Sequence, residues 1–246
     1  MKKLLYLINF EIGMQIKKIL IITAVMFLVQ SIAIMLVSSV DKNSYLRFEE
    51  LLSMSGIPIM FVLALGVILV FSAFSFYRDF VDGKSIYALL TLPQKREYIF
   101  YSKTASSVIS VFMLWAAQFG SIFICYGIYN ASTYGVPKVH NALLLAFTRS
   151  DFLRVLFPLD TLYFVITALI LLTFVIFAVF VAIAERSKKY KYMFVPLPWV
   201  LGMLMFSVFP LYSYRYNILF VFAAIILLDF VLVKLAIKLV KTQQLG

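Results

Sequence analysis

Apolar residues in this chain occur in long runs, which are separated by short segments rich in lysine, arginine and polar side chains. A helix of about 20 consecutive apolar residues is long enough to cross the hydrocarbon layer of a bilayer. The pattern therefore predicts an all-α, polytopic membrane protein with six spans in a single transmembrane domain over residues 1–246. The predicted spans are residues 19–40, 57–77, 104–129, 161–184, 192–212 and 218–240.

Residues 1–18 precede the first predicted span and combine basic side chains with an apolar helical face. This pattern predicts an amphipathic helix along the inner membrane surface, and a frayed basic terminus is the alternative. The first apolar run lacks a small-residue cleavage site, so we do not expect a signal peptide. The apolar face consists of Leu4, Leu5, Ile8, Ile12, Ile16 and Ile19.

The longest predicted outer loop covers residues 130–160, and its residues 142–157 mix apolar with charged positions. This stretch is too short and too charged to span a bilayer. We predict an amphipathic helix that either lies on the outer surface or re-enters the membrane, and that Pro158 closes. A plain surface loop is the alternative.

The composition agrees with a membrane protein, because 64% of the residues are hydrophobic and only 13% are charged. The mean hydropathy of +1.02 is too high for a typical soluble domain. The net charge of +11 comes from basic residues at the ends of apolar runs, so we do not expect nucleic-acid binding. Most of the 22 lysines and arginines belong to one set of loops, which includes both termini. This asymmetry predicts a multi-pass protein of the cell membrane with both termini in the cytoplasm.

Cys125 is the only cysteine and His140 the only histidine. One cysteine cannot form an intrachain disulfide or a thiolate metal cluster, and one loop histidine makes a zinc site or a Ser-His-Asp triad unfavourable. An intramembrane protease or phosphatase would also need paired carboxylates or several histidines within the spans. We therefore expect a non-catalytic chain without a metal site.

Three polar residues within the predicted spans are candidates for a pathway or for structural contacts. Asp229 is the only carboxylate deep within a span, where an unpaired charge is costly. An ion pair with Lys234 or Lys238 is the preferred interpretation, and a role in translocation is the alternative. Gln30 and Gln118 either line a pathway or join helices through hydrogen bonds.

Residues 78–103, RDFVDGKSIYALLTLPQKREYIFYSK, form the longest charged segment between two apolar runs. Gly83 permits a sharp reversal of the backbone direction. Residues 84–91 are then predicted to form a short helix, which Pro93 ends. The letters GKS imitate the end of a phosphate-binding loop, but that motif requires a glycine where this chain has Arg78. The sequence offers no other nucleotide site, so any dependence on ATP requires another subunit.

This segment contains a basic–acidic pair, a glycine, a short helix, a Leu-Pro step, a basic cluster and a lysine at the foot of the next span. In this order it resembles the stretch between the second and third spans of ABC-2 type exporter permeases. The six spans, inward termini and amphipathic N-terminal helix are similar to that family over nearly the whole chain. The resemblance implies a coupling helix at residues 84–91 that inserts into a groove on a separate ATP-binding subunit. The residues implied in coupling are Arg78, Asp79, Gly83, Lys84, Tyr87, Leu90, Leu92, Pro93, Lys95 and Arg96.

The basic turn at residues 185–192 would be a second contact of the ATP-binding subunit, through Arg186, Lys188 and Lys189, unless these residues only anchor the spans. The resemblance also implies that ATP and Mg bind to the partner, that this chain holds no cofactor, and that two identical or different permeases dimerise. The cargo would be hydrophobic or amphipathic, such as a drug, a toxin or a peptide of the phenol-soluble modulin type. A secondary transporter or channel that ATP does not drive is the alternative. The chain departs from many family members in placing its outer segment after the third span rather than between the last two.

Overall fold

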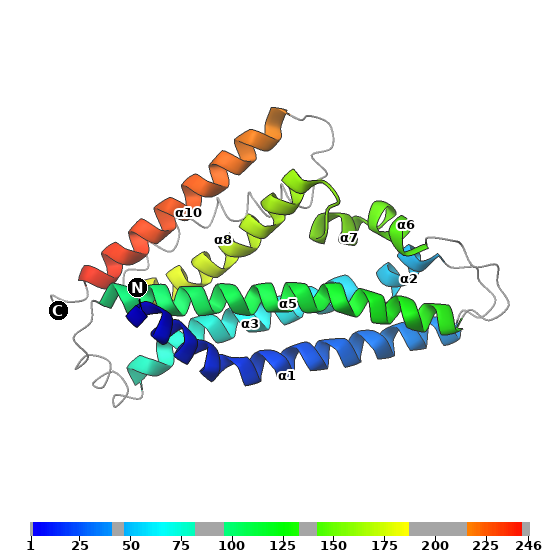
Figure 1. Ribbon diagram of the computed structural model, residues 1–246, viewed down its shortest axis with the longest axis horizontal. Helices are drawn as coiled ribbons and strands as arrows, with labels where there is room; N and C mark the ends of the chain where they lie inside the picture. The colour runs from blue at the N-terminus through cyan, green and yellow to red at the C-terminus, as the bar shows by residue number, and fades with distance from the viewer. Residues whose placement is uncertain (1, 41–46, 82–95, 133–141, 187–215, 243–246) are drawn as a thin grey trace. The chain divides into compact units, whose positions relative to one another are not determined.

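The computed structural model describes residues 2–40, 47–81, 96–132, 142–186 and 216–242, and all regular elements in these residues are helices (Figure 1). This confirms the predicted all-α fold class for the part of the chain that the structure describes. The helices are α1 Lys2–Val40, α2 Phe48–Met54, α3 Ile57–Val81, α5 Arg96–Ser132, α6 Ala142–Arg149, α7 Asp151–Leu156, α8 Thr161–Arg186 and α10 Tyr216–Thr242.

Four of the described helices are long and apolar enough to cross a membrane. Their apolar stretches coincide with the first four predicted spans. The sixth predicted span coincides with α10, a 27-residue helix that is not among these four. The fifth predicted span, 192–212, lies outside the described residues. The four stretches are Leu4–Ser39, Ile57–Ser75, Phe100–Ala131 and Thr161–Glu185.

Several helices are longer than their predicted spans. The interfacial helix and the first span, predicted as two elements, form the single helix α1. Helix α3 continues through Arg78 and Asp79, and α5 begins at Arg96 rather than at residue 104. The apolar run marks only the part of a helix that suits hydrocarbon, whereas the backbone hydrogen bonds of the helix can continue into the interface.

The segments predicted as outer loops contain two details that the hydrophobic pattern does not indicate. Residues 142–157 form two short helices instead of one, because Ser150 caps α7 by accepting a hydrogen bond from the Leu153 amide at 3.5 Å. Helix α2 lies in a predicted loop, and the Glu50 carboxylate accepts a hydrogen bond from the Arg47 amide at 3.1 Å at its start. At α7 a side-chain oxygen satisfies a free amide of the first turn, and at α2 the third helical residue satisfies the amide of the residue before the helix.

The chain divides into two compact units, which are described separately. Unit 1 consists of residues 1–15, 68–111 and 168–246. Unit 2 consists of residues 16–67 and 112–167. The long helices α1, α3, α5 and α8 each contribute one part to each unit.

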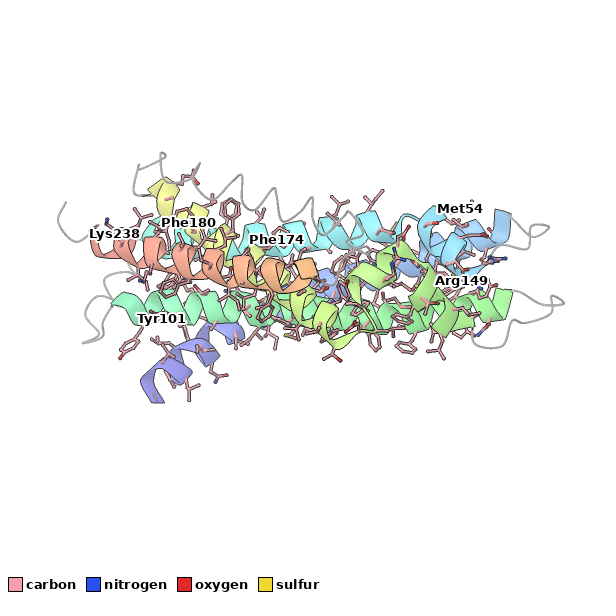
Figure 2. All side chains as sticks on the ribbon, turned by 90° about the horizontal axis from the view of Figure 1, so that it is seen from above. Met54, Tyr101, Arg149, Phe174, Phe180 and Lys238 are labelled. Carbon is pink, nitrogen blue, oxygen red and sulfur yellow. The ribbon has the colours of Figure 1, made fainter. Side chains whose placement is uncertain are left out.

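Unit 2 has an aromatic core at the end that contains α2 and α6. The Phe48 ring of α2 lies 5.3 Å from that of Tyr126 and 5.4 Å from that of Tyr129. Helix α6 packs beside α2, with Arg149 3.6 Å from Glu49, and Figure 2 shows Met54 and Arg149 at this same end. The short helices α2 and α6 are therefore packed at the end of α5 and do not form loose surface loops.

Unit 1 buries apolar residues of its long helices together with polar residues of α3 and α5. Val179 and Phe180 of α8 and Leu232 of α10 are completely buried. Carboxylate, ammonium, amide, hydroxyl and backbone carbonyl groups make additional polar contacts among α1, α3 and α5. This polar part of unit 1 lies at the helix ends that border residues 82–95.

Candidate functional site

Most residues of the predicted coupling segment lie outside the described part of the chain. Of the others, Arg78 and Asp79 belong to the last turns of α3, Arg96 is the first residue of α5, and Arg186 is the last residue of α8. The structure thus places the two helix ends between which the predicted coupling helix lies. The predicted residues outside the description are Gly83, Lys84, Tyr87, Leu90, Leu92, Pro93, Lys95, Lys188 and Lys189.

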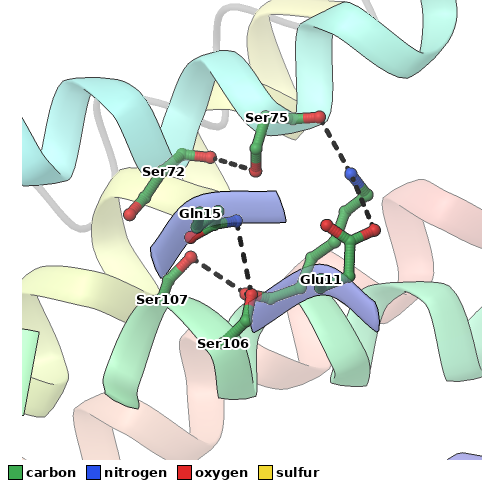
Figure 3. A network of polar contacts seen from close by, with 7 residues as sticks. Glu11, Gln15, Ser72, Ser75, Ser106 and Ser107 are labelled. Carbon is green, nitrogen blue, oxygen red and sulfur yellow. Dashed lines mark hydrogen bonds and ion pairs between the residues drawn. The ribbon is translucent and has the colours of Figure 1, made fainter. Parts of the chain in front are cut away.

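Lys103 connects three helices at the base of this segment. Its side chain is only 1% exposed, and its Nζ lies 3.5 Å from Oε1 of Glu11 on α1. The same Nζ donates a hydrogen bond of 2.9 Å to the backbone carbonyl of Ser75 on α3 (Figure 3). Lys103 belongs to α5, so this one ammonium group links α5 to both α1 and α3.

A row of serines continues this contact along α5. The hydroxyls of Ser106 and Ser107 each donate a 2.9 Å hydrogen bond to the Lys103 carbonyl. Gln15 of α1 donates from Nε2 to the Ser106 hydroxyl at 3.5 Å and accepts from Ser110 through Oε1 at 3.4 Å. Small serine side chains allow two helices to approach closely, and their hydroxyls supply polar contacts within the apolar layer.

These contacts also set the relative direction of two helices within unit 1. Glu11 pairs with Lys103, and Gln15, one turn later in α1, contacts Ser106 and Ser110, which also follow Lys103 in α5. The two helices therefore run parallel in this unit. We name the six residues Glu11, Gln15, Ser75, Lys103, Ser106 and Ser110 the Lys103 cluster.

The electrostatics of the Lys103 cluster are those of a buried ion pair. Removing an ammonium and a carboxylate from water is unfavourable, and their attraction compensates only when further hydrogen bonds complete the geometry. The Ser75 carbonyl supplies one such bond to Lys103. Loss of one partner would remove this attraction from a charge held in a buried contact, so the pair stabilises one arrangement of α1, α3 and α5.

Most contacts of this cluster are not predicted by the sequence pattern. Lys103 is predicted only as the lysine at the foot of the third span, and no pattern connects Glu11 or Gln15 with α5. A signal was nevertheless present, because polar residues at 103, 106, 107 and 110 share one helical face. The pattern does not reveal which helix covers that face.

Gln30 and Gln118 form a second polar contact, within unit 2. Both side chains are completely buried, and Gln30 donates from Nε2 to Oε1 of Gln118 at 2.9 Å. Ser121 donates to Oε1 of Gln30 at 2.7 Å. Among the described residues, Nε2 of Gln118 has no hydrogen-bond partner. The buried geometry is that of a helix-joining contact, the second of the two predicted roles.

Asp229 does not form the predicted ion pair with Lys234 in the described part of the chain. The Lys234 ammonium lies instead 4.3 Å from the ring centroid of Phe230, and Oδ1 of Asp229 is buried without a hydrogen-bond partner among the described residues. Five residues along an α-helix rotate a side chain by about 140°, which directs Lys234 away from Asp229.

Among the described residues, no group of three or more His, Cys, Asp or Glu side chains is arranged to hold a metal ion. The chemistry that the Lys103 cluster supports is the joining of three helices by an ion pair and hydrogen bonds. Comparisons of the chain with protein-family models, with curated proteins and with solved structures gave no match. Support for a function therefore comes from the sequence pattern and from the geometry of the site.

Proposed function

We propose that this chain is the membrane-spanning permease subunit of an ABC exporter. In this role it has six spans and cytoplasmic termini in the cell membrane, and it pairs with a second permease. A separate ATP-binding subunit binds ATP and Mg and docks on residues 84–91, with the turn at residues 185–192 as a second contact. The exported cargo is hydrophobic or amphipathic, such as a peptide, a toxin or a drug.

The observation that carries this proposal is the position of the Lys103 cluster. Residues 82–95 follow directly after α3 and directly precede α5. Lys103 joins these two helices through Ser75, and it joins both to α1 through Glu11. A displacement of the segment by a docked partner would therefore move three helices together.

The direction of the helices supports the same topology. Helices α1 and α5 run parallel in unit 1, so both start on the same side of the membrane if both cross it. Helix α3 is then the single return crossing between them, and residues 82–95 lie on the same side as the N-terminus. The lysines and arginines near these helix starts favour the cytoplasm for that side.

The coupling assignment is tested by substituting two residues of the predicted coupling helix. The double variant Tyr87→Ala, Leu90→Asp removes an aromatic anchor and places a charge in an apolar contact, so an ABC ATP-binding subunit encoded beside this chain should no longer copurify with it. Stimulation of the partner's ATPase by the permease, and export, should be lost together. Leu159→Ala in the outer segment is the matched control and should leave both intact.

Two results would contradict the proposal. One is a wild-type chain that never copurifies with an ATP-binding subunit but transports when an ion gradient alone is applied, as a secondary transporter would. The other is a Tyr87→Ala, Leu90→Asp variant that is inserted normally and still exports.

A further inference from the structure

The junction between α7 and α8 contacts α5 far from the end of that helix. The indole Nε1 of Trp115 donates a 3.0 Å hydrogen bond to the carbonyl of Leu156, the last residue of α7. The Trp115 ring stacks on Phe157 with centroids 5.8 Å apart and on Phe164 with centroids 4.9 Å apart. From Trp115 to the end of α5 at Ser132 the helix rises about 25 Å at 1.5 Å per residue. The junction therefore lies well below that end of α5.

Exposed apolar side chains continue beyond the level of Trp115. On α5 itself, Phe123 and Ile124 lie between Trp115 and Ser132, and both are exposed. On α1, Leu36 is 61% exposed, and it follows Gln30, which contacts α5 at Gln118. Apolar surface of this kind faces lipid in a membrane protein, so hydrocarbon extends past the junction.

The backbone groups at this junction are satisfied by side chains and by the chain itself. The Leu156 carbonyl accepts from Trp115, and the Val155 carbonyl accepts from the Thr167 hydroxyl at 3.0 Å. At the start of α8, Asp160 accepts from the Leu162 amide through Oδ1 at 3.0 Å. A chain break within hydrocarbon requires such partners, because water is not there to replace them.

Charged side chains are exposed at the same junction. The side chain of Asp151 is 89% exposed and accepts a 2.9 Å hydrogen bond from Arg154, and Asp160 is also exposed. An ionised carboxylate facing lipid at this depth would be strongly unfavourable. These exposed carboxylates therefore require water, whereas the Phe157 ring is buried and stacks on Trp115.

We propose that α6 and α7 form a re-entrant segment, that α8 begins within the membrane, and that the exposed carboxylates of Asp151 and Asp160 contact water from the outer side. This conclusion requires that the long apolar helices are embedded in a bilayer, and its outer side rests on the cytoplasmic N-terminus of the proposed function. It does not depend on the identity of the cargo or on an ATP-binding partner.

Single-cysteine labelling of the full chain in lipid vesicles tests this proposal, in a Cys125→Ala background because Cys125 is a buried native thiol. Leu159→Cys probes the junction while leaving the Asp160 cap in place, and Asp151→Cys probes the other exposed carboxylate position independently. Leu63→Cys is the control that faces lipid, and Arg149→Cys marks the end of unit 2 near α2. The probe is a membrane-impermeant maleimide added to the outer side.

The cysteines at positions 149, 151 and 159 are expected to react with the maleimide. The cysteine at position 63 is expected not to react. Depth is measured separately, from the relaxation of a spin label at the same cysteines by gadolinium chelates on the outer lipid headgroups. Relaxation should be clearly weaker at 159 than at 149. Equal relaxation at 159 and 149 would place the junction on the outer surface and overturn the re-entrant segment. If spin labels at 151 and 159 are deep and the cysteines at these positions do not react with the impermeant maleimide, the proposed contact with water would be wrong.

Discussion

The Lys103 cluster of unit 1 and the aromatic contact around Trp115 in unit 2 attach other segments to α5 by different interactions. Both attach other segments to α5, and both place a nitrogen donor on a backbone carbonyl, at 2.9 Å from Lys103 and at 3.0 Å from Trp115. The Lys103 cluster also buries a charge pair, whereas the Trp115 contact relies on stacked rings. The difference indicates that losing one partner should disturb the charged contact far more than the neutral one.

The largest effect is expected for Glu11→Leu. This change leaves the Lys103 ammonium buried without its carboxylate, which should reduce the free energy of unfolding by about 3–5 kcal/mol. The double variant Glu11→Leu, Lys103→Met should recover most of that loss, because no unpaired charge remains. Thermal unfolding of the purified chain in detergent measures both.

Glu49→Leu is the matched control for this prediction, since its partner Arg149 is half exposed. An exposed ion pair contributes only about 0–1 kcal/mol, so this variant should unfold close to the wild type. If Glu11→Leu behaved like Glu49→Leu, or if the double variant were as unstable as the single one, the charge pair would not be what holds α1 on α5.

An intermediate effect is expected for Trp115→Phe. The ring is largely retained, but the Leu156 carbonyl loses its donor, which should cost about 1–3 kcal/mol for a buried acceptor. In the labelling experiment, the same variant should increase reactivity of a cysteine at 159. Phe123→Leu, an exposed position on the same helix, is the control. An unchanged stability and an unchanged reactivity would show that the indole donor does not anchor the junction.

The smallest effect is expected at the buried amide pair. Gln118→Leu removes the acceptor of Gln30, and interhelical hydrogen bonds in membrane proteins contribute about 0.6 kcal/mol on average and at most about 1.7 kcal/mol. The double variant Gln30→Leu, Gln118→Leu should be nearly as stable as the wild type and should still transport. Loss of transport in a stable double variant would instead assign the pair to a pathway.

The sequence predicted the positions of long helices better than the contacts between them. Apolar runs located α3, α8 and most of α1 and α5, because the bilayer requires a minimum apolar length whatever the neighbours are. The same signal does not show that α5 begins at Arg96, before the predicted span, and it merged α6 with α7. Ends of helices depend on capping groups and on interfacial residues, such as Ser150, that the hydrophobic pattern does not register.

The candidate site was only partly predictable for a similar reason. The pattern of residues 78–103 indicated where a partner could dock, and the polar face of α5 from Lys103 to Ser110 was visible as a periodicity. That Glu11 covers this face, rather than a residue of another span, could not be read from spacing. Glu11 and Lys103 lie about ninety residues apart in the sequence, and nothing local in either segment encodes their pairing.

By itself, the sequence determined that this protein is helical, apolar and suited to a membrane, since these properties depend on the length and composition of local runs. Only the tertiary structure decided that a buried lysine joins three helices beside residues 82–95, and that Trp115 holds the start of α8 well below the end of α5. Both are contacts between segments distant in the chain. Their energies come from burial and hydrogen bonding, which exist only once the helices have packed together.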